Sequence, residues 1–84
     1  MMLVEIKTTL SISDVDKHMD RIAIIRKFMD DRGDTRKITG AVAGGSVDDS
    51  VSEYAHAQGL YVVVQSGDAV EISDTPAGFK AREW

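Results

Sequence analysis

The sequence predicts a small α/β protein with the element order β-α-β-α-β-β and a mixed, mostly parallel sheet. Segments rich in valine and isoleucine alternate with segments whose apolar residues recur every three or four positions. Glycines follow the ends of both helix-like segments. The chain of 84 residues is long enough for one core, so a single domain is expected over residues 1–84.

The first strand is expected at residues 3–9, where apolar and polar side chains alternate. A helix of about five turns follows, because its apolar residues fit the 3.6-residue period. Its start is assigned to Ser13, since Asp16 three residues later completes a capping-box pattern. Gly33 can adopt the left-handed conformation that ends a helix. The inward-facing positions are Val15, Met19, Ile22, Ile25 and Met29.

The second strand is expected at residues 37–44, whose small side chains allow a helix or another backbone to approach closely. A short helix should begin after Asp48 or Asp49 and run through Gln58. Gly59 then supplies the residue that stops this helix.

Residues 60–65 carry apolar side chains on both faces, as expected for an interior parallel strand. A tight turn at Ser66-Gly67 should reverse the chain into an antiparallel partner at residues 69–73. The tail from residue 74 to residue 84 has no periodic pattern and is expected to be irregular.

The element order also predicts how the layers are arranged. Two strand-helix-strand units imply parallel strands joined by right-handed crossovers. If the strands lie in sequential order, both helices cover the same face of the sheet. The opposite face then has no cover from this chain, and the strand at residues 3–9 forms an open edge. Self-association into a homo-oligomer, a homodimer in the simplest case, is therefore expected.

Composition limits the classes of function. The net charge of −4, without a basic block, is a weak basis for nucleic-acid binding by this chain alone. There is no cysteine, which excludes disulfides and thiolate metal sites and agrees with a reducing, cytoplasmic location. The apolar runs are too short to span a bilayer, so no membrane partner is expected.

Glu5 and Lys7 are the candidate catalytic residues. Residues two apart on a strand project from the same face, so a carboxylate and an ammonium group should lie side by side. Phosphodiester hydrolysis can use such a pair, because the carboxylate binds a divalent cation and the lysine stabilises the attacking water or the developing charge. A solvated surface ion pair has the same local pattern.

A longer series of motifs accompanies this pair along most of the chain. As a whole the series resembles the C-terminal part of an uncharacterised bacterial branch of the PD-(D/E)XK, or restriction-endonuclease-like, superfamily. The segments that carry the resemblance are residues 4–9, the serine-capped helix after them, residues 40–44, Tyr54-Ala55, residues 59–63, Ser66-Gly67 and residues 79–84.

The resemblance implies a truncated restriction-endonuclease-like core that lacks the N-terminal helix and strands of the full fold. It implies that Glu5 binds a metal ion, Mg²⁺ if the protein is active, and that Lys7 is the catalytic lysine. The aspartate that the superfamily carries on a preceding strand has no counterpart in this sequence. One carboxylate is a poor magnesium site unless other ligands join it.

Three functions follow as hypotheses. The first is an incomplete, non-catalytic nuclease-like domain that self-associates. The second is a metal-dependent DNA nuclease whose site is completed between subunits. The third is a protein-binding adaptor that uses the aromatic tail.

Other polar and aromatic residues are explained more simply by structural roles. Asp14 and His18, like Glu53 and His56, have helical spacing, but neither pair has a third metal ligand nearby in sequence. The turn residues 44–46 lack the lysine of a phosphate-binding loop. The aromatic residues Tyr61, Phe79 and Trp84 could stack nucleic-acid bases, although an aromatic tail more commonly covers an apolar surface.

Overall fold

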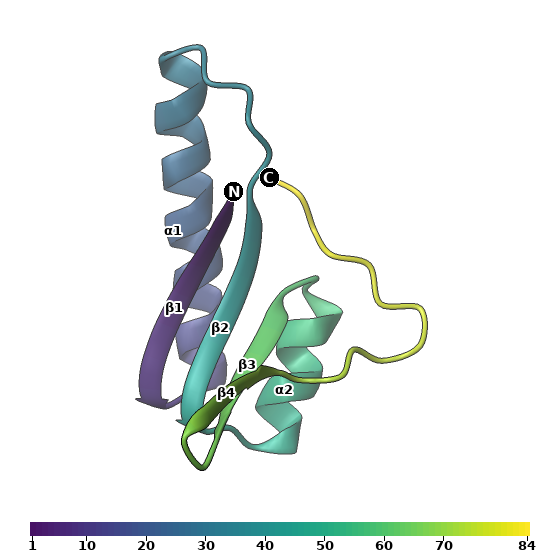
Figure 1. Cartoon of the computed structure of the whole chain (residues 1–84). Helices are drawn as coiled ribbons and strands as arrows, with labels where there is room; N and C mark the ends of the chain where they lie inside the picture. The colour runs from purple at the N-terminus through teal and green to yellow at the C-terminus, as the bar shows by residue number, and fades with distance from the viewer.

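The computed structural model describes the backbone of residues 1–84 and all side chains except that of Ser66. Its helices and strands follow one another in the predicted order (Figure 1). The strands lie in the order β1-β2-β3-β4, with the first three parallel and β4 antiparallel to β3. The mixed, mostly parallel α/β fold is therefore confirmed. The elements are β1 Met2–Thr9, α1 Ile12–Asp31, β2 Thr39–Ser46, α2 Asp49–Ala57, β3 Tyr61–Ser66 and β4 Ala69–Ile72.

Helix α1 begins two residues earlier than predicted, with Ser11 as its N-cap. The Ser11 hydroxyl accepts a hydrogen bond from the Asp14 backbone N–H at 3.2 Å. The Asp14 carboxylate accepts one from the Ser11 backbone N–H at 3.0 Å, which completes the capping box. The prediction that Ser13 and Asp16 form this box was wrong.

Packing explains why the earlier of the two overlapping Ser-x-x-Asp patterns is used. With Ser11 as the cap, the residue before the cap is Leu10 and the fourth helical residue is Val15. Both side chains are buried in the core, as in a hydrophobic staple. With Ser13 as the cap, the same two positions would fall on Ile12 and Lys17, which are exposed.

Both helices end at the predicted glycines. After α1, Gly33 has φ +75° and donates its N–H to the Asp30 carbonyl, while Asp34 donates to the Met29 carbonyl at 2.8 Å. These two bonds form a Schellman motif. Gly59 has φ +81° and follows the last turn of α2 in the same way.

Several strand boundaries differ from the prediction by one or two residues. Strand β2 continues past Gly44 to Ser46, because its parallel pairing with β1 continues as far as the Thr9–Ser46 pair. The hairpin turn lies at Gly67 and Asp68 instead of Ser66-Gly67, since the backbone of Ser66 still pairs with Ala69. Glycine tolerates both a strand interior and a turn, so local composition did not distinguish the two alignments.

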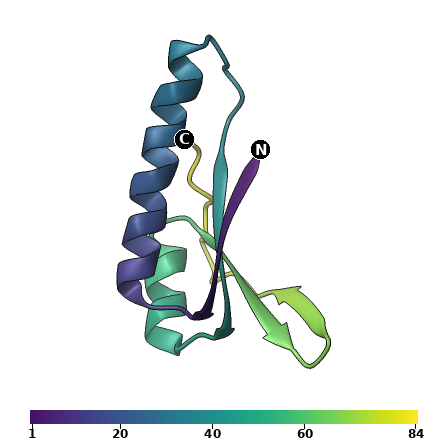
Figure 2. The same ribbon diagram turned by 90° about the vertical axis from the view of Figure 1, so that its left-hand side faces the viewer.

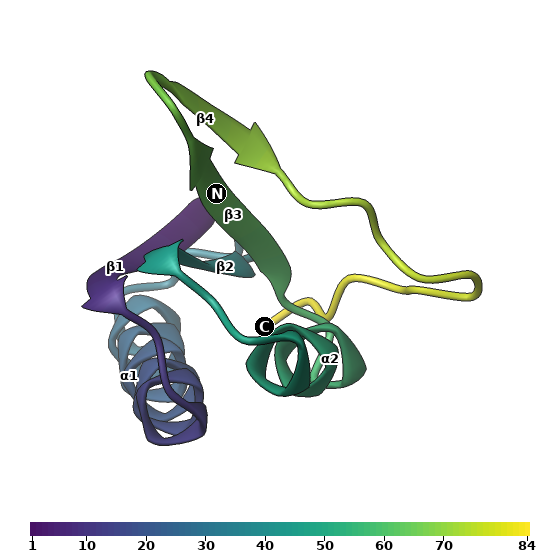
Figure 3. The ribbon, with the colours of Figure 1, turned by 90° about the horizontal axis from the view of Figure 1, so that it is seen from below.

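The core lies between the sheet and the two helices, which cover the same face of the sheet (Figure 3). Gly40 on β2 makes this contact close, because a Cβ atom there would lie 2.6 Å from Leu60 Cδ2 and 2.9 Å from Ile22 Cδ1. This confirms the predicted close approach at the small residues of β2. The buried core consists of Leu10, Val15, Ile22, Met29, Ile38, Val42, Val51, Ala55, Leu60 and Val62.

The opposite face of the sheet carries neither helix, and in side view the β3–β4 hairpin projects away from the helices (Figure 2). Large apolar side chains on this face are exposed to solvent. Ile6 is 75% exposed, Val70 72% and Ile72 62%. The uncovered face predicted from sequential strand order is therefore present, and β1 pairs with β2 alone.

The irregular tail returns to the helix side of the sheet. The backbones of Trp84 and Ile38 exchange two hydrogen bonds, of 2.9 and 3.0 Å, and the Trp84 side chain packs against the core. Phe79 contacts Tyr61 at a centroid distance of 5.3 Å and His56 at 5.6 Å. In the described chain, neither α1 nor α2 has the length and apolar character that a bilayer crossing requires.

Candidate functional site

Glu5 and Lys7 lie on the helix side of β1, on the same face as the half-buried Leu3. They line a small polar hollow, of about 40 Å³, between β1 and the first turns of α1. The predicted proximity of the pair is confirmed, because Lys7 Nζ is 3.9 Å from Glu5 Oε1. The α1 residues that line the hollow are Asp14, Lys17, His18 and Arg21.

Arg21 is the nearer ionic partner of Glu5. Its Nη1 atom donates a hydrogen bond of 2.6 Å to Glu5 Oε2. The Glu5 side chain is 20% exposed, so an arginine and a lysine contact a carboxylate that is largely shielded from solvent. The sequence analysis missed Arg21, which is 16 residues from Glu5. The available signal was its position three residues after His18, on the same edge of the helix.

The Asp14 carboxylate points into its own helix cap. Besides the Ser11 backbone N–H, it accepts a hydrogen bond of 2.9 Å from the Ser11 hydroxyl. These bonds from Ser11 stabilise the charged form and lower the pKa of Asp14 below its usual value. Asp14, the second acidic residue of the hollow, is therefore engaged in capping α1.

His18 attaches α1 to the edge strand. Its side chain is only 3% exposed, and Nε2 lies 3.1 Å from the Leu3 carbonyl oxygen. A carbonyl oxygen can only accept, so Nε2 donates this hydrogen bond. Nδ1 is buried without a hydrogen-bond partner. His18 therefore packs as a core residue, in agreement with the structural interpretation of the Asp14–His18 pair.

The donor set around Glu5 does not fit a magnesium ion. No group of three or more Asp, Glu or His side chains within reach of a common metal ion occurs in the part of the chain that the structure describes. Mg²⁺ requires near-octahedral oxygen ligation, whereas the neighbours of Glu5 are two cationic nitrogens. As it stands, the hollow holds an ion pair between a strand and a helix.

The other candidate residues from the sequence analysis are packed within the fold. Gly44 lies within β2, where a Cβ atom would approach Val47 Cγ2 to 2.8 Å, so this segment is a packed strand and not a phosphate loop. Phe79 and Tyr61 contact each other, whereas Trp84 packs beside Gly40 and lies under the Arg82 guanidinium.

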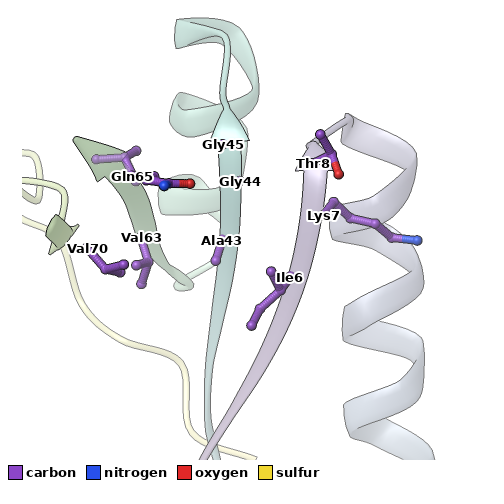
Figure 4. A pocket seen from close by; sticks show the side chains of 10 residues that line it. Ile6, Lys7, Thr8, Ala43, Gly44, Gly45, Val63, Gln65 and Val70 are labelled. Carbon is purple, nitrogen blue, oxygen red and sulfur yellow. The ribbon is translucent and has the colours of Figure 1, made fainter. Parts of the chain in front are cut away.

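A second surface lies on the uncovered face of the sheet, where a hollow of about 400 Å³ opens over the C-terminal halves of the parallel strands (Figure 4). Ala43 and Gly45 of β2 line it together with Val63 of β3. Ile6 on β1 and Val70 on β4 stand on either side of it.

Strand register identifies the full set of residues on this face, because paired residues of neighbouring strands point the same way. None of them is charged. They are Met2, Val4, Ile6 and Thr8 on β1, Thr39, Ala41, Ala43 and Gly45 on β2, Tyr61, Val63 and Gln65 on β3, and Val70 and Ile72 on β4.

The two surfaces lie on opposite sides of one sheet. Glu5 and Ile6 are consecutive on β1 and therefore point in opposite directions. The ion pair faces α1, and the apolar hollow faces solvent. Comparison of the chain with models of protein families, with curated proteins and with solved structures finds no match.

Proposed function

We propose that this chain is a non-catalytic domain, nuclease-like by resemblance, that forms a homodimer through the uncovered face of its sheet. The observation that carries the proposal is the exposure of Val4, Ile6, Val70 and Ile72 on that face. Contiguous exposed apolar surfaces commonly mark interaction sites.

The size of the face sets the expected strength of association. A four-stranded face of this length covers on the order of 400 Å², given the spacings of residues and strands in a sheet. Stable interfaces bury about 800 Å² per partner. The dimer should therefore be weak, with dissociation in the micromolar range, and its population should depend on protein concentration.

Charge supports a second copy as the occupant. The chain has a net charge of −4, so two copies repel each other over most orientations. The uncovered face has no charged side chain at the positions given above, which makes it the surface where two copies meet with least repulsion. A partner selected by charge would find no complementary group there.

The contacts of Glu5 support a non-catalytic role. Arg21 and Lys7 neutralise its carboxylate, and the uncovered face lies on the other side of the sheet. Association through that face therefore brings no ligand to Glu5. The nuclease alternative requires a different dimer, in which a partner adds an acid at the unpaired edge of β1.

The adaptor alternative requires the tail to be available to a partner. Trp84 is tied to Ile38 and packs against the core, so deletion of the tail would also damage the fold. Phe79 is the tail residue to substitute, by serine, in a test of partner binding.

The proposal is tested by Ile6→Lys, with Ile24→Lys as the matched control. Ile6 is 75% exposed on the uncovered face, and Ile24 is 69% exposed on α1. Both changes add the same charge to an exposed isoleucine. Sedimentation equilibrium at several concentrations should show a dimer for the wild type and for Ile24→Lys, and a monomer for Ile6→Lys.

Two outcomes would contradict the proposal. One is a wild-type protein that stays monomeric at concentrations well above the micromolar range. The other is a dimer that Ile6→Lys leaves intact, which would place the interface elsewhere. Circular dichroism of both variants verifies that each remains folded.

A further inference from the structure

We infer that Ile6 of each copy enters the hollow above Ala43 of its partner, so that the dimer is held by two equivalent knob-and-hole contacts. This inference rests on the proposed function and specifies how the uncovered faces meet. It follows from the relief of the face, its symmetry and its volume.

The relief of the face provides both halves of the contact. Ile6 projects from β1 and is 75% exposed, the largest exposure among the large apolar residues of the described chain. Beside it lies the hollow, whose floor on β2 is formed by small residues, Ala43 and Gly45. Val70 on β4 bounds its other side.

The order of the strands makes this relief self-complementary. A two-fold axis that runs parallel to the strands, midway between two stacked sheets and displaced from β2 toward β1, places β1 of one copy over the boundary between β2 and β3 of the other. Ile6 then lies opposite the hollow of the partner, and the same operation places the partner's Ile6 opposite the first hollow. Two sheets packed in this way keep their strands nearly aligned, as sandwich packing requires.

The volumes are compatible. The hollow measures about 400 Å³. A buried isoleucine occupies on the order of 170 Å³ at the density of protein interiors. The hollow therefore has room for the Ile6 side chain of the partner together with further side chains around it. Left open in a dimer, the same space would be an apolar cavity, which destabilises an interface.

The experiment uses two complementary variants of the full chain. Ala43→Met fills the hollow from its floor, and Ile6→Ala removes the knob. Each variant alone should dimerise at least tenfold more weakly than the wild type. When the two are mixed, the intact Ile6 of one meets the intact hollow of the other, so the heterodimer should exceed its statistical share in native mass spectrometry.

Ala23→Met on the exposed side of α1 is the control for the added methionine and should leave dimerisation unchanged. If Ala43→Met lowers the melting temperature, Val63→Met fills the same hollow from β3 and replaces it. A wild-type dimer that Ala43→Met does not weaken, or a mixture without excess heterodimer, would overturn the docking geometry and leave the proposed dimer standing. A monomeric wild type would overturn both.

Discussion

The guanidinium of Arg21 on α1 lies 2.6 Å from the carboxylate of Glu5 on β1, and this ion pair joins the long helix to the edge strand. Glu5 is the residue to which the resemblance assigns metal binding. Its partners, Arg21 and Lys7, give the carboxylate a structural role in this fold.

The Glu5–Arg21 pair should contribute modestly to stability. We expect a double-mutant cycle of Glu5→Gln and Arg21→Gln, measured by urea unfolding, to give a coupling energy of about 0.5 kcal/mol, because Arg21 is largely exposed. Calorimetric titration with Mn²⁺ should give the same heats for the wild type and Glu5→Gln. Saturable Mn²⁺ binding that Glu5→Gln abolishes would restore the enzyme hypothesis.

Ser11 and Ser13 at the start of α1 allow a test of which serine caps the helix. Ser11→Ala should destabilise the protein by about 1 kcal/mol, because it removes the side-chain cap of the helix. Ser13→Ala should stay within about 0.5 kcal/mol of the wild type, since this exposed residue lies inside the first turn. Urea denaturation measures both. Equal losses, or a larger loss for Ser13→Ala, would contradict the assigned cap.

Gly33 and Gly59 both have positive φ, so replacing each by alanine distinguishes the cost of backbone strain from the added cost of steric overlap. Gly33→Ala should cost about 1–2 kcal/mol, the strain of an L-residue at positive φ, because nothing lies within 4 Å of its new Cβ atom. Gly59→Ala should cost at least about 3 kcal/mol, because strain is joined by overlap with Arg82. Its Cβ atom would lie 2.7 Å from both Arg82 N and Arg82 Cβ. Similar melting temperatures for the two variants would show that the tail does not pack against Gly59.

Lowering the pH should reduce the stability that the loop after α1 contributes to the fold. The side chain of Arg36 binds both carboxylate oxygens of Asp34 and its backbone N–H binds one, which holds the pKa of Asp34 at about 2 instead of 3.8. A pKa lowered in the folded state contributes stability above the unfolded value, and this contribution is lost as the pH falls from 3.8 to about 2.

Urea unfolding between pH 2 and pH 5 tests this effect. Asp34→Asn should lower stability at pH 5 and reduce the loss on acidification. Asp31→Asn, which removes a carboxylate nearby in the chain, should retain the wild-type slope. An identical pH dependence for wild type and Asp34→Asn would show that the Asp34–Arg36 contact does not persist in solution.

Much of the architecture could be predicted from local patterns. The element order, both helix-ending glycines and the shared face of Glu5 and Lys7 depend on backbone periods and on residues a few positions apart. The uncovered face followed from the number and order of the elements. These features require no knowledge of which distant side chains meet.

Tertiary structure decided what depends on contacts between distant segments. Ser11 caps α1 instead of Ser13 because Leu10 and Val15 enter the core together. Arg21 reaches Glu5 because α1 folds back along β1, and no local pattern specifies which helical residue will face a given strand position. Short-range periodicity thus determined the elements and their faces, whereas the packing of helices on the sheet determined the helix start and the ionic partners of Glu5.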